Sequence, residues 1–431
     1  MKYVTNIKNK MYFEEQKYKM EPIKGPLEKE VIQVYPDIER QEWMGMGGAL
    51  TQSSNTNYLK LTSEKQKELL DCYFSIEGLN YDYIRLPIGS CDFSPISYSY
   101  VNKKDGSDFS LEKDEEFLFP MLYQVRDYKQ LTYLSVPWSP PSIWKRKKKL
   151  YQGDSLKKEY YSNYARYLIR YIQEMKERGI DIAYMSMQNE PFACQTWESC
   201  EWTIEEQKEF IQDYFIPELS HHKLETKILL WDHNKEDLYR ITKELYNNQE
   251  EVAGVCFHWY SGGHFEQLSL IHEKYPNLLL VESEMCCGYS SYSEEEWSKD
   301  ASYYLKEIMN NINHGMNLWF DWNLLLDYYG GPNHKNNYCK SPIILNEEGN
   351  DYIKTPIYYF LKHLSVIPTP SKVVFTSSFT DDLLCVAMKN DDNLYVVIYN
   401  QGSEAKKYHL VFDRQFIDDE LEEHSVVTYI L

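Results

Sequence analysis

Short apolar segments alternate with longer, mostly amphipathic segments through the middle of this chain. Near-continuous hydrophobicity is typical of parallel strands that are covered on both faces, and parallel strands need a helix-sized connection between them. The alternation therefore predicts an α/β fold, namely a (β/α)8 TIM barrel. The eight expected strands are Met44–Leu50, Tyr81–Pro87, Leu131–Trp138, Ile182–Met187, Lys227–Asp232, Gly254–Tyr260, Leu278–Glu284 and Met316–Asn323.

Helical features occur between these segments. Ser63-x-x-Gln66 and Thr203-x-x-Glu206 have the form of a capping box, in which two side chains satisfy the free N–H groups at the start of a helix. We therefore expect helices to open at Ser63 and at Thr203. Residues 157–178 have an amphipathic pattern that predicts one long helix.

The pattern changes at both ends of the chain. After about residue 365, short strand-like runs follow one another with Asp, Asn and Gly turns between them, and no helical stretch intervenes. We expect residues 366–431 and 1–38 to form one small, discontinuous antiparallel β-sandwich domain, and residues 39–365 to form the barrel. The expected C-terminal strands are Lys372–Thr376, Leu383–Met388, Leu394–Tyr399, Tyr408–Phe412 and Ser425–Leu431.

Polar and aromatic residues gather at the C-terminal ends of the expected barrel strands. In a TIM barrel these ends meet on one face, which is where active sites lie. We therefore expect one functional site built from several strands. The residues concerned are Arg85, Asp92, Trp138, Asn189, Glu190, Asp232, His258, Tyr260, Glu284, Trp322 and Asn323.

Two of these strand ends carry carboxyl groups suited to glycoside hydrolysis. Glu190 follows a buried strand, and Pro191 stops the strand from continuing. A retaining glycosidase needs a second carboxyl group about 5 Å from the first. The seventh strand offers Glu282 and Glu284, and a period of two lets both point the same way. Position nearer the mouth favours Glu284, while Glu282 is the alternative nucleophile or a structural charge.

The charge and composition of the chain limit the kinds of molecule that it is expected to bind. The net charge of −20 disfavours nucleic acid and anionic membranes. The basic run Lys145–Lys149 is the local exception, and we interpret it as a solvated loop, with an anionic ligand as the alternative. Nine cysteines without metal-like spacing indicate reduced thiols. We expect no metal and no cofactor.

The N-terminus carries positive charge but no apolar segment of the kind found in secretory signals. Stretches of about 18 apolar residues do not occur in the sequence. We therefore expect a cytoplasmic protein without stable membrane insertion.

Nine motifs occur in the same order in a known enzyme family. They are Gly45–Thr51, Ile84–Pro87, Ser90–Ser94, Pro137–Pro140, Gln188–Pro191, His258–Tyr260, Ser283–Cys286, Asp321–Leu324 and Gly330–Asn333. Through them the sequence resembles glycoside hydrolase family 30 over most of its length. The resemblance implies that Glu190 is the acid/base and that Glu284, rather than Glu282, is the nucleophile.

The resemblance also implies roles for the neighbouring residues. Asn189 would bind the sugar 2-hydroxyl. Asp92 and Trp138 would hold hydroxyls on the far side of the sugar, and Trp322 would form a wall of the same pocket.

Three further residues are implied to complete the site. Arg85 would orient the nucleophile, with a purely structural ion pair as the alternative. His258 and Tyr260 would shape the site near the nucleophile, and a satisfied core histidine is the alternative for His258. We also expect the nearby carboxylate to raise the pKa of Glu190.

The expected activity is that of a retaining exo-β-glycosidase, first of all a β-glucosidase, acting on a β-linked glucoside or oligosaccharide. Within the family, a β-xylosidase and an endo-β-1,6-glucanase are the alternatives. Outside it, we consider a catalytically dead carbohydrate-binding barrel and a lipid-processing enzyme at membranes, for which Lys145–Lys149 is the one indication. The sequence departs from the family pattern at Met285 and Cys287, behind the expected nucleophile.

Overall fold

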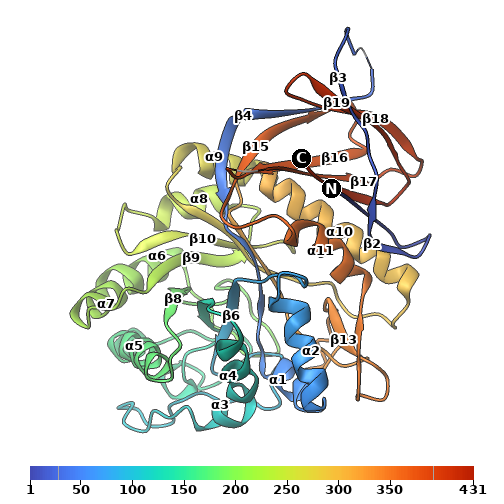
Figure 1. The fold of residues 1–431 in the computed structure, drawn as a ribbon. Coiled ribbons are helices and arrows are strands. Elements are labelled where there is room, and N and C mark those ends of the chain that lie inside the picture. The colour runs from blue at the N-terminus through green and yellow to red at the C-terminus, as the bar shows by residue number, and fades with distance from the viewer. Residues whose placement is uncertain (28, 392) are drawn as a thin grey trace.

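Eight parallel strands close into a barrel in the order in which they occur along the chain (Figure 1). The last strand pairs with the first, so the TIM-barrel prediction is confirmed. The computed structural model describes residues 1–27, 29–391 and 393–431. The barrel strands are β5 (Gly45–Ala49), β6 (Tyr83–Ile88), β7 (Thr132–Pro137), β8 (Ile182–Met185), β9 (Lys227–Asn234), β10 (Val252–His258), β11 (Leu279–Met285) and β12 (Leu318–Asp321).

Helices follow the barrel strands and cover the barrel from outside (Figure 1). Their buried residues are mostly apolar and pack on the strands, which explains why both faces of the strands are hydrophobic. The α-helices are α1 (Gln52–Tyr58), α2 (Ser63–Phe74), α3 (Glu112–Phe117), α4 (Phe119–Tyr128), α5 (Tyr161–Glu177), α6 (Ile204–Glu209), α7 (Ile216–His221), α8 (Leu238–Leu245), α9 (Phe265–Lys274), α10 (Glu294–Asn313) and α11 (Pro356–Ser365). Short 3-10 turns η1 (Ser142–Trp144) and η2 (Lys158–Tyr160) precede α5, and a π-helical stretch η3 (Phe210–Phe215) joins α6 to α7.

One of the two predicted caps is confirmed and one is wrong by a residue. Thr203 and Glu206 form the reciprocal capping box in front of α6. At α2 the cap is Thr62, whose hydroxyl accepts from the backbone N–H of Lys65. The side chain of Gln66 instead donates to two carbonyl groups of the preceding turn, so it cannot close a box around Ser63.

The two ends of the chain form a ten-stranded sheet beside the barrel. Its order, β2-β1-β20-β17-β16-β15-β4-β18-β19-β3, mixes N-terminal and C-terminal strands, as expected for a discontinuous domain. All neighbours are antiparallel except β4 and β18. The strands are β1 (Lys2–Asn6), β2 (Met11–Gln16), β3 (Met20–Pro22), β4 (Val31–Trp43), β15 (Ser371–Ser378), β16 (Leu383–Lys389), β17 (Leu394–Asn400), β18 (Lys406–Phe412), β19 (Gln415–Leu421) and β20 (Val426–Ile430).

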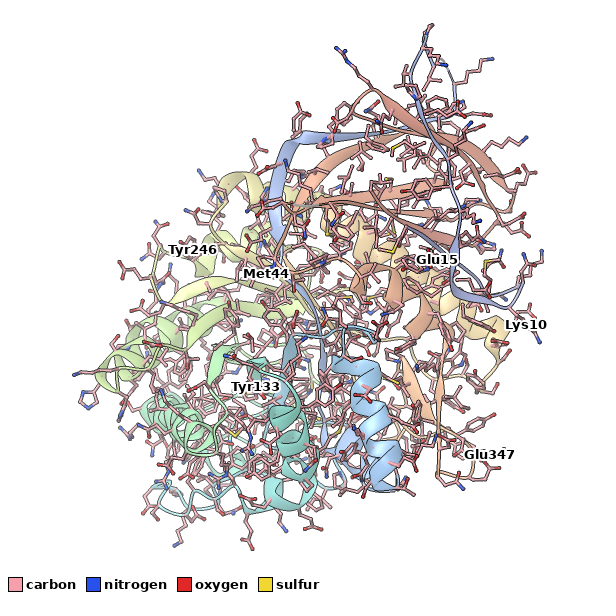
Figure 2. The ribbon with its side chains drawn as sticks, in the orientation of Figure 1. Lys10, Glu15, Met44, Tyr133, Tyr246 and Glu347 are labelled. Atoms are coloured by element: carbon pink, nitrogen blue, oxygen red, sulfur yellow. The ribbon has the colours of Figure 1, made fainter. Side chains whose placement is uncertain are left out.

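The sheet curls around its own apolar core, and α10 and α11 lie between it and the barrel (Figure 1). The sequence did not predict β19, because its segment is mostly polar. Strand β4 extends beyond residue 38 and leads directly into the barrel near Met44, which Figure 2 labels between the two layers. A small hairpin of β13 (Ile343–Leu345) and β14 (Tyr352–Lys354) completes the fold.

A buried histidine joins the two parts. His363 on α11 lies between the hydroxyls of Thr5 and Thr428, at 2.7 and 2.8 Å. Burial lowers the pKa of His363 to about 3, so the ring is neutral and can donate to one hydroxyl and accept from the other. Among the described residues, no helix is both long and apolar enough to cross a bilayer.

Candidate active site

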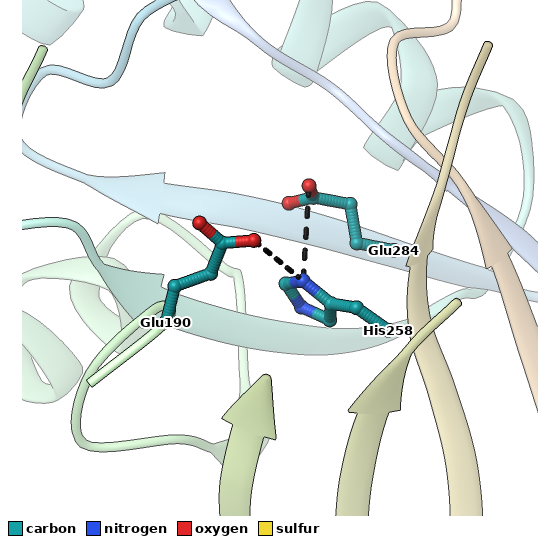
Figure 3. Close-up of side chains that lie close together, drawn as sticks. All are labelled: Glu190, His258 and Glu284. Carbon is teal, nitrogen blue, oxygen red and sulfur yellow. Dashed lines mark hydrogen bonds and ion pairs between the residues drawn. The ribbon is translucent and has the colours of Figure 1, made fainter. Parts of the chain in front are cut away.

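Glu190 and Glu284 face each other at the C-terminal mouth of the barrel. One carboxylate oxygen of each lies within 4.8 Å of the other, and Figure 3 shows both side chains directed at His258. The backbone of Glu190 has φ = +48°, and its N–H donates to the carbonyl of Asp232 at 2.9 Å. The turn after β8 is therefore fixed to the neighbouring strand, and Glu190 is held over the barrel.

A register irregularity separates Glu284 from Glu282. Along β10 and β11, Phe257 pairs with Glu282 but His258 pairs with Glu284, so one extra residue is inserted at Ser283. Such a bulge breaks the alternation of side chains. Glu282 consequently contacts Asn311 of α10 at 3.0 Å, while Glu284 contacts residues inside the barrel mouth. The expectation that both side chains share a direction is wrong.

Arg85 is the cation at the centre of the site. Its side chain is fully buried, and Nη1 donates to Glu284 Oε2 at 2.6 Å. Nη2 donates to Asn189 Oδ1 at 2.8 Å and to Asp232 Oδ2 at 3.1 Å. Burial lowers the pKa of Arg85, but the charges of Asp232 and Glu284 outweigh this effect and raise it above its usual value. A fixed guanidinium therefore orients one carboxylate oxygen of Glu284.

His258 lies among three carboxylates. Nδ1 is 3.2 Å from Glu190 Oε1 and 3.9 Å from Glu284 Oε1, and Nε2 is 3.2 Å from Asp232 Oδ1 (Figure 3). Burial lowers the pKa of His258, but the charge of Glu284 and the hydrogen bonds with Asp232 and Glu190 raise it to about 10. The ring is thus an imidazolium at neutral pH, and its two N–H groups face Glu190 and Asp232.

The pKa expected for Glu190 is wrong in direction. Burial raises the pKa of Glu190, but the hydrogen bond and charge of His258 outweigh burial and lower it below its usual value. The sequence patterns indicated that Glu284 lies near Glu190, but they did not indicate that a charged His258 lies between the two carboxylates. Without a bound sugar, the proton that lies between these two side chains therefore resides on Nδ1 of His258. This nitrogen is 3.2 Å from Glu190 Oε1.

Asp232 connects the two cations. Two successive residues in left-handed conformations, Trp231 (φ +74°) and Asp232 (φ +68°), interrupt the pairing of β9 with β10 and direct this carboxylate into the barrel. It contacts Arg85, His258 and the hydroxyl of Ser283. Burial raises the pKa of Asp232, but the charge of Arg85 and the contacts with His258 lower it well below its usual value. In the sequence, its position at a strand end and its match to an acidic position of the resembled family indicated this residue.

Tyr260 contacts Glu284 from the open side of the site. Its hydroxyl donates to Glu284 Oε1 at 3.1 Å and lies 3.3 Å from Cys286 Sγ. The residue is 43% exposed, whereas Glu284 is 7% exposed. Glu284 thus has Arg85 on one oxygen and Tyr260 on the other.

Asp92 lies on the opposite side, in a closed corner. Its carboxylate accepts from Asn337 Nδ2 at 2.9 Å and is 3% exposed. Burial and the charge of Glu284 raise the pKa of Asp92 to about 8. Asn337 was not predicted, because it lies on a long loop after β12, where no periodic pattern marks its direction.

Trp138 and Trp322 are brought together as expected. Their rings stack with centroids 5.2 Å apart, and the guanidinium of Arg85 lies 4.9 Å from the first ring and 5.4 Å from the second. Both rings are almost fully buried. The two rings hold Arg85 by cation–π contacts, in addition to the role in the sugar pocket that the sequence resemblance implies for them.

Loops around the mouth are tied together by a buried lysine. Lys145 is 0% exposed, and its ammonium donates to Ser139 Oγ at 2.9 Å and to the carbonyls of Gly153 and Ser199 at 2.9 and 2.7 Å. The prediction of a solvated loop is therefore wrong for Lys145, although residues 146–149 are exposed. The contact fixes the loop after β7 to the loop after β8.

Glu190, His258 and Glu284 place three ligand-type atoms within 4.8 Å of one another. Their other contacts do not favour a metal ion. His258 carries its own charge, and Arg85 already occupies Glu284 Oε2. A cation added here would meet an imidazolium and a guanidinium.

Known proteins share both the sequence motifs and the architecture. The glycosyl hydrolase family 30 TIM-barrel domain matches residues 43–367. Lysosomal acid glucosylceramidase from Mus musculus is 29% identical over 401 residues, which are 87% of this chain and 78% of that protein. SrfJ from Salmonella typhimurium matches with a TM-score of 0.95 at 28% identity, covering 100% of this chain and 98% of that chain. An endo-β1,6-glucanase matches with a TM-score of 0.88 at 26% identity and the same coverage. This chain belongs to glycoside hydrolase family 30 and is a glycoside hydrolase.

Proposed function

We propose that the protein is a retaining exo-β-glycosidase, and specifically a β-glucosidase. The observation that carries the proposal is the pair of carboxylates within 4.8 Å, one of them held by Arg85 and Tyr260. Retaining enzymes place their two carboxyl groups about 5 Å apart, whereas inverting enzymes leave space for a water molecule. The presence of both carboxylates in this arrangement disfavours a catalytically dead binding protein.

In the proposed reaction, Glu284 Oε1, the oxygen that Arg85 leaves free, attacks the anomeric carbon while Glu190 protonates the departing oxygen. The proton that Glu190 delivers comes from Nδ1 of His258. A water molecule then gives its proton to Glu190 and breaks the glycosyl–Glu284 bond. Esterification removes one of the negative charges beside His258, which lowers the pKa of the ring while its proton passes through Glu190 to the leaving group; when hydrolysis restores the charge of Glu284, the proton that Glu190 took from water returns to Nδ1 of His258.

The remaining polar groups fit the binding of one sugar. Asn189 accepts from Arg85 through Oδ1, so its amide N–H groups are oriented and able to donate to the 2-hydroxyl. Asp92 and Asn337 form a hydrogen-bonding corner for hydroxyls farther along the ring. The contacts at the 2-hydroxyl strengthen as positive charge develops in the transition state.

An exo preference is supported by the contacts that close the side of Asp92. His334 Nδ1 lies 2.8 Å from the carbonyl of Ser94, and His334 Nε2 lies 3.4 Å from Glu198 Oε2. These contacts join the loops after β6, β8 and β12. A sugar chain extending beyond a first sugar bound at Asp92 would have to displace them, whereas Tyr260 is open on the leaving-group side.

The first test is hydrolysis of aryl β-glucoside, β-xyloside, β-fucoside and β-galactoside, with Glu284→Ala as the blank. We expect strong turnover of the glucoside and none in the blank. Proton NMR of the first product should show the β-anomer. An α-anomer appearing first would mean inversion and would exclude the two-step mechanism.

A β-1,6-glucanase is the second candidate, because an endo-β1,6-glucanase shares this fold across the whole chain at 26% identity. This second candidate would be supported if the folded protein hydrolysed none of the four aryl glycosides but cleaved β-1,6-linked glucan. The basic run that indicated a lipid-processing role at membranes loses Lys145, which is buried and engaged with neighbouring oxygen atoms, and keeps residues 146–149 exposed.

A further inference from the structure

Two buried cysteines face each other beside Glu284. Cys286 follows β11 directly, Cys339 lies on the loop after β12, and their sulfur atoms are 3.4 Å apart. The side chains are 8% and 5% exposed. Backbone hydrogen bonds of 2.9 Å from Lys340 to Cys287 and from Tyr289 to Tyr338 hold the two segments together. Both cysteines are free thiols in this structure.

The pair is connected to the candidate nucleophile through one hydroxyl. Cys286 Sγ lies 3.3 Å from Tyr260 Oη, and this hydroxyl donates to Glu284 Oε1 at 3.1 Å. A single side chain, that of Tyr260, therefore separates the Cys286 sulfur from the carboxylate.

Cys286 lines a pocket next to Tyr260. A pocket of about 740 Å³ is lined by Trp259, Tyr260, Cys286 and Cys287, among other residues. The hydrogen bond with Cys286, together with burial, raises the pKa of Cys339. Cys286, which lines the pocket, is thus placed as the attacking thiol and Cys339 as the resolving thiol.

We propose that Cys286 and Cys339 form a reversible disulfide that lowers glycosidase activity, with a low-molecular-weight disulfide such as oxidised glutathione as oxidant. The Cys286 thiolate attacks one sulfur of the oxidant and releases one small thiol, which takes up a proton. The Cys339 thiolate then attacks the Cys286 sulfur of the mixed disulfide and releases the second small thiol. The protein loses two electrons and two protons, and the oxidant gains both.

Closure draws the two sulfur atoms from 3.4 Å to about 2.05 Å. The Cys286 sulfur then leaves its contact with Tyr260, and the hydrogen bond from Tyr260 to Glu284 loosens. Because sub-ångström to ångström displacements of reacting groups are costly, we expect kcat to fall at least about tenfold. This consequence rests on the proposed function, whereas disulfide formation does not.

The experiment treats the whole protein with oxidised glutathione and follows two readouts. Peptide mass spectrometry should detect a link between the segments containing Cys286 and Cys339, and hydrolysis of an aryl β-glucoside should fall and recover with dithiothreitol. A Cys287→Ser variant assigns the link to Cys286. Absence of the linked peptide in folded, oxidant-treated protein would overturn the proposal whether or not the protein hydrolyses glucosides.

Two further variants test the connection to activity. Cys286→Ser should form no link and should keep in oxidant the activity of its own reduced form, because the attacking thiol is gone. Cys194→Ser removes an exposed thiol elsewhere and should be inactivated like the wild type. Loss of activity in oxidised Cys286→Ser, or a complete link with unchanged kcat in the wild type, would overturn the role of the pair in regulation.

Discussion

Arg85 and Glu284 form a buried ion pair in which Nη1 donates to Oε2 at 2.6 Å. The same guanidinium reaches Asp232 and Asn189 and is covered by two stacked tryptophan rings. A single residue of β6 thus organises side chains from the ends of three other strands. It leaves the second oxygen of Glu284 to Tyr260 and to the incoming sugar.

Replacement of Arg85 by methionine should destabilise the protein by about 3–5 kcal/mol, because the two buried carboxylates of Asp232 and Glu284 lose one of the two cations that they contact. Urea unfolding at neutral pH measures the loss. Arg85→Lys is the matched control, since it keeps the charge but cannot donate to three acceptors in a fixed plane. Its stability should lie between those of wild type and Arg85→Met. Equal stability of wild type and Arg85→Met would contradict the structural role that we assign to this cation.

Glu284 and Glu282 offer a matched pair for the nucleophile. Burial, with the charge of Glu307, raises the pKa of Glu282 to about 8, so this carboxyl group is mostly protonated at pH 7. Glu282→Gln therefore resembles the native state and should keep most of the activity. Glu284→Gln should abolish turnover of an aryl β-glucoside. Similar losses in the two variants would show that the nucleophile is wrongly assigned.

Glu190→Ala should lower kcat on substrates with poor leaving groups by about 10²–10⁴-fold, the usual contribution of a general acid. Azide should restore turnover of an aryl glucoside with a good leaving group, because it attacks the glycosyl–Glu284 ester without needing a base. The product should be the β-glycosyl azide. The Glu284→Ala variant should give the α-azide by direct displacement. An α-azide from Glu190→Ala would therefore mean that Glu190 is the nucleophile and Glu284 the acid/base.

Hydrophobic periodicity was sufficient for the barrel and for the strand ends that carry the site, since both depend on which residues must be buried. It failed where the backbone departs from regular pairing. The insertion at Ser283 turns Glu282 outward, and the left-handed residues Trp231 and Asp232 direct the carboxylate of Asp232 to Arg85 and His258. Neither has a periodic signal, because each depends on pairing with a neighbouring strand.

Contacts that are distant in sequence were also beyond prediction. Lys145 resembled a solvated lysine, yet carbonyl groups from two later loop segments surround its ammonium. The protonation of Glu190 depends on His258, 68 residues away. Charge runs and spacing describe the residues themselves, whereas burial and pKa depend on partners that only the folded chain supplies.

Lys145→Met should destabilise the protein by about 2 kcal/mol or more, because buried carbonyl groups that now accept from the ammonium would lose their donor. Lys147→Met, at an exposed position of the same run, should change stability by less than about 0.5 kcal/mol. Thermal unfolding followed by circular dichroism compares the two. Equal effects would mean that the contacts of Lys145 do not hold the loops around the mouth.

His258 should make stability depend on alkaline pH. Its pKa is about 10 in the folded protein and about 6.5 in an unfolded chain, so the folded state binds more protons between these values. The stabilisation by the imidazolium is complete below pH 6.5 and is lost as pH rises toward 10. The difference in unfolding free energy between wild type and His258→Asn should therefore be larger at pH 6 than at pH 9.5. Urea unfolding at the two pH values measures it. If the His258→Asn difference stayed constant across this range, the ring would be neutral at pH 7, and it could not hold the proton that Glu190 delivers.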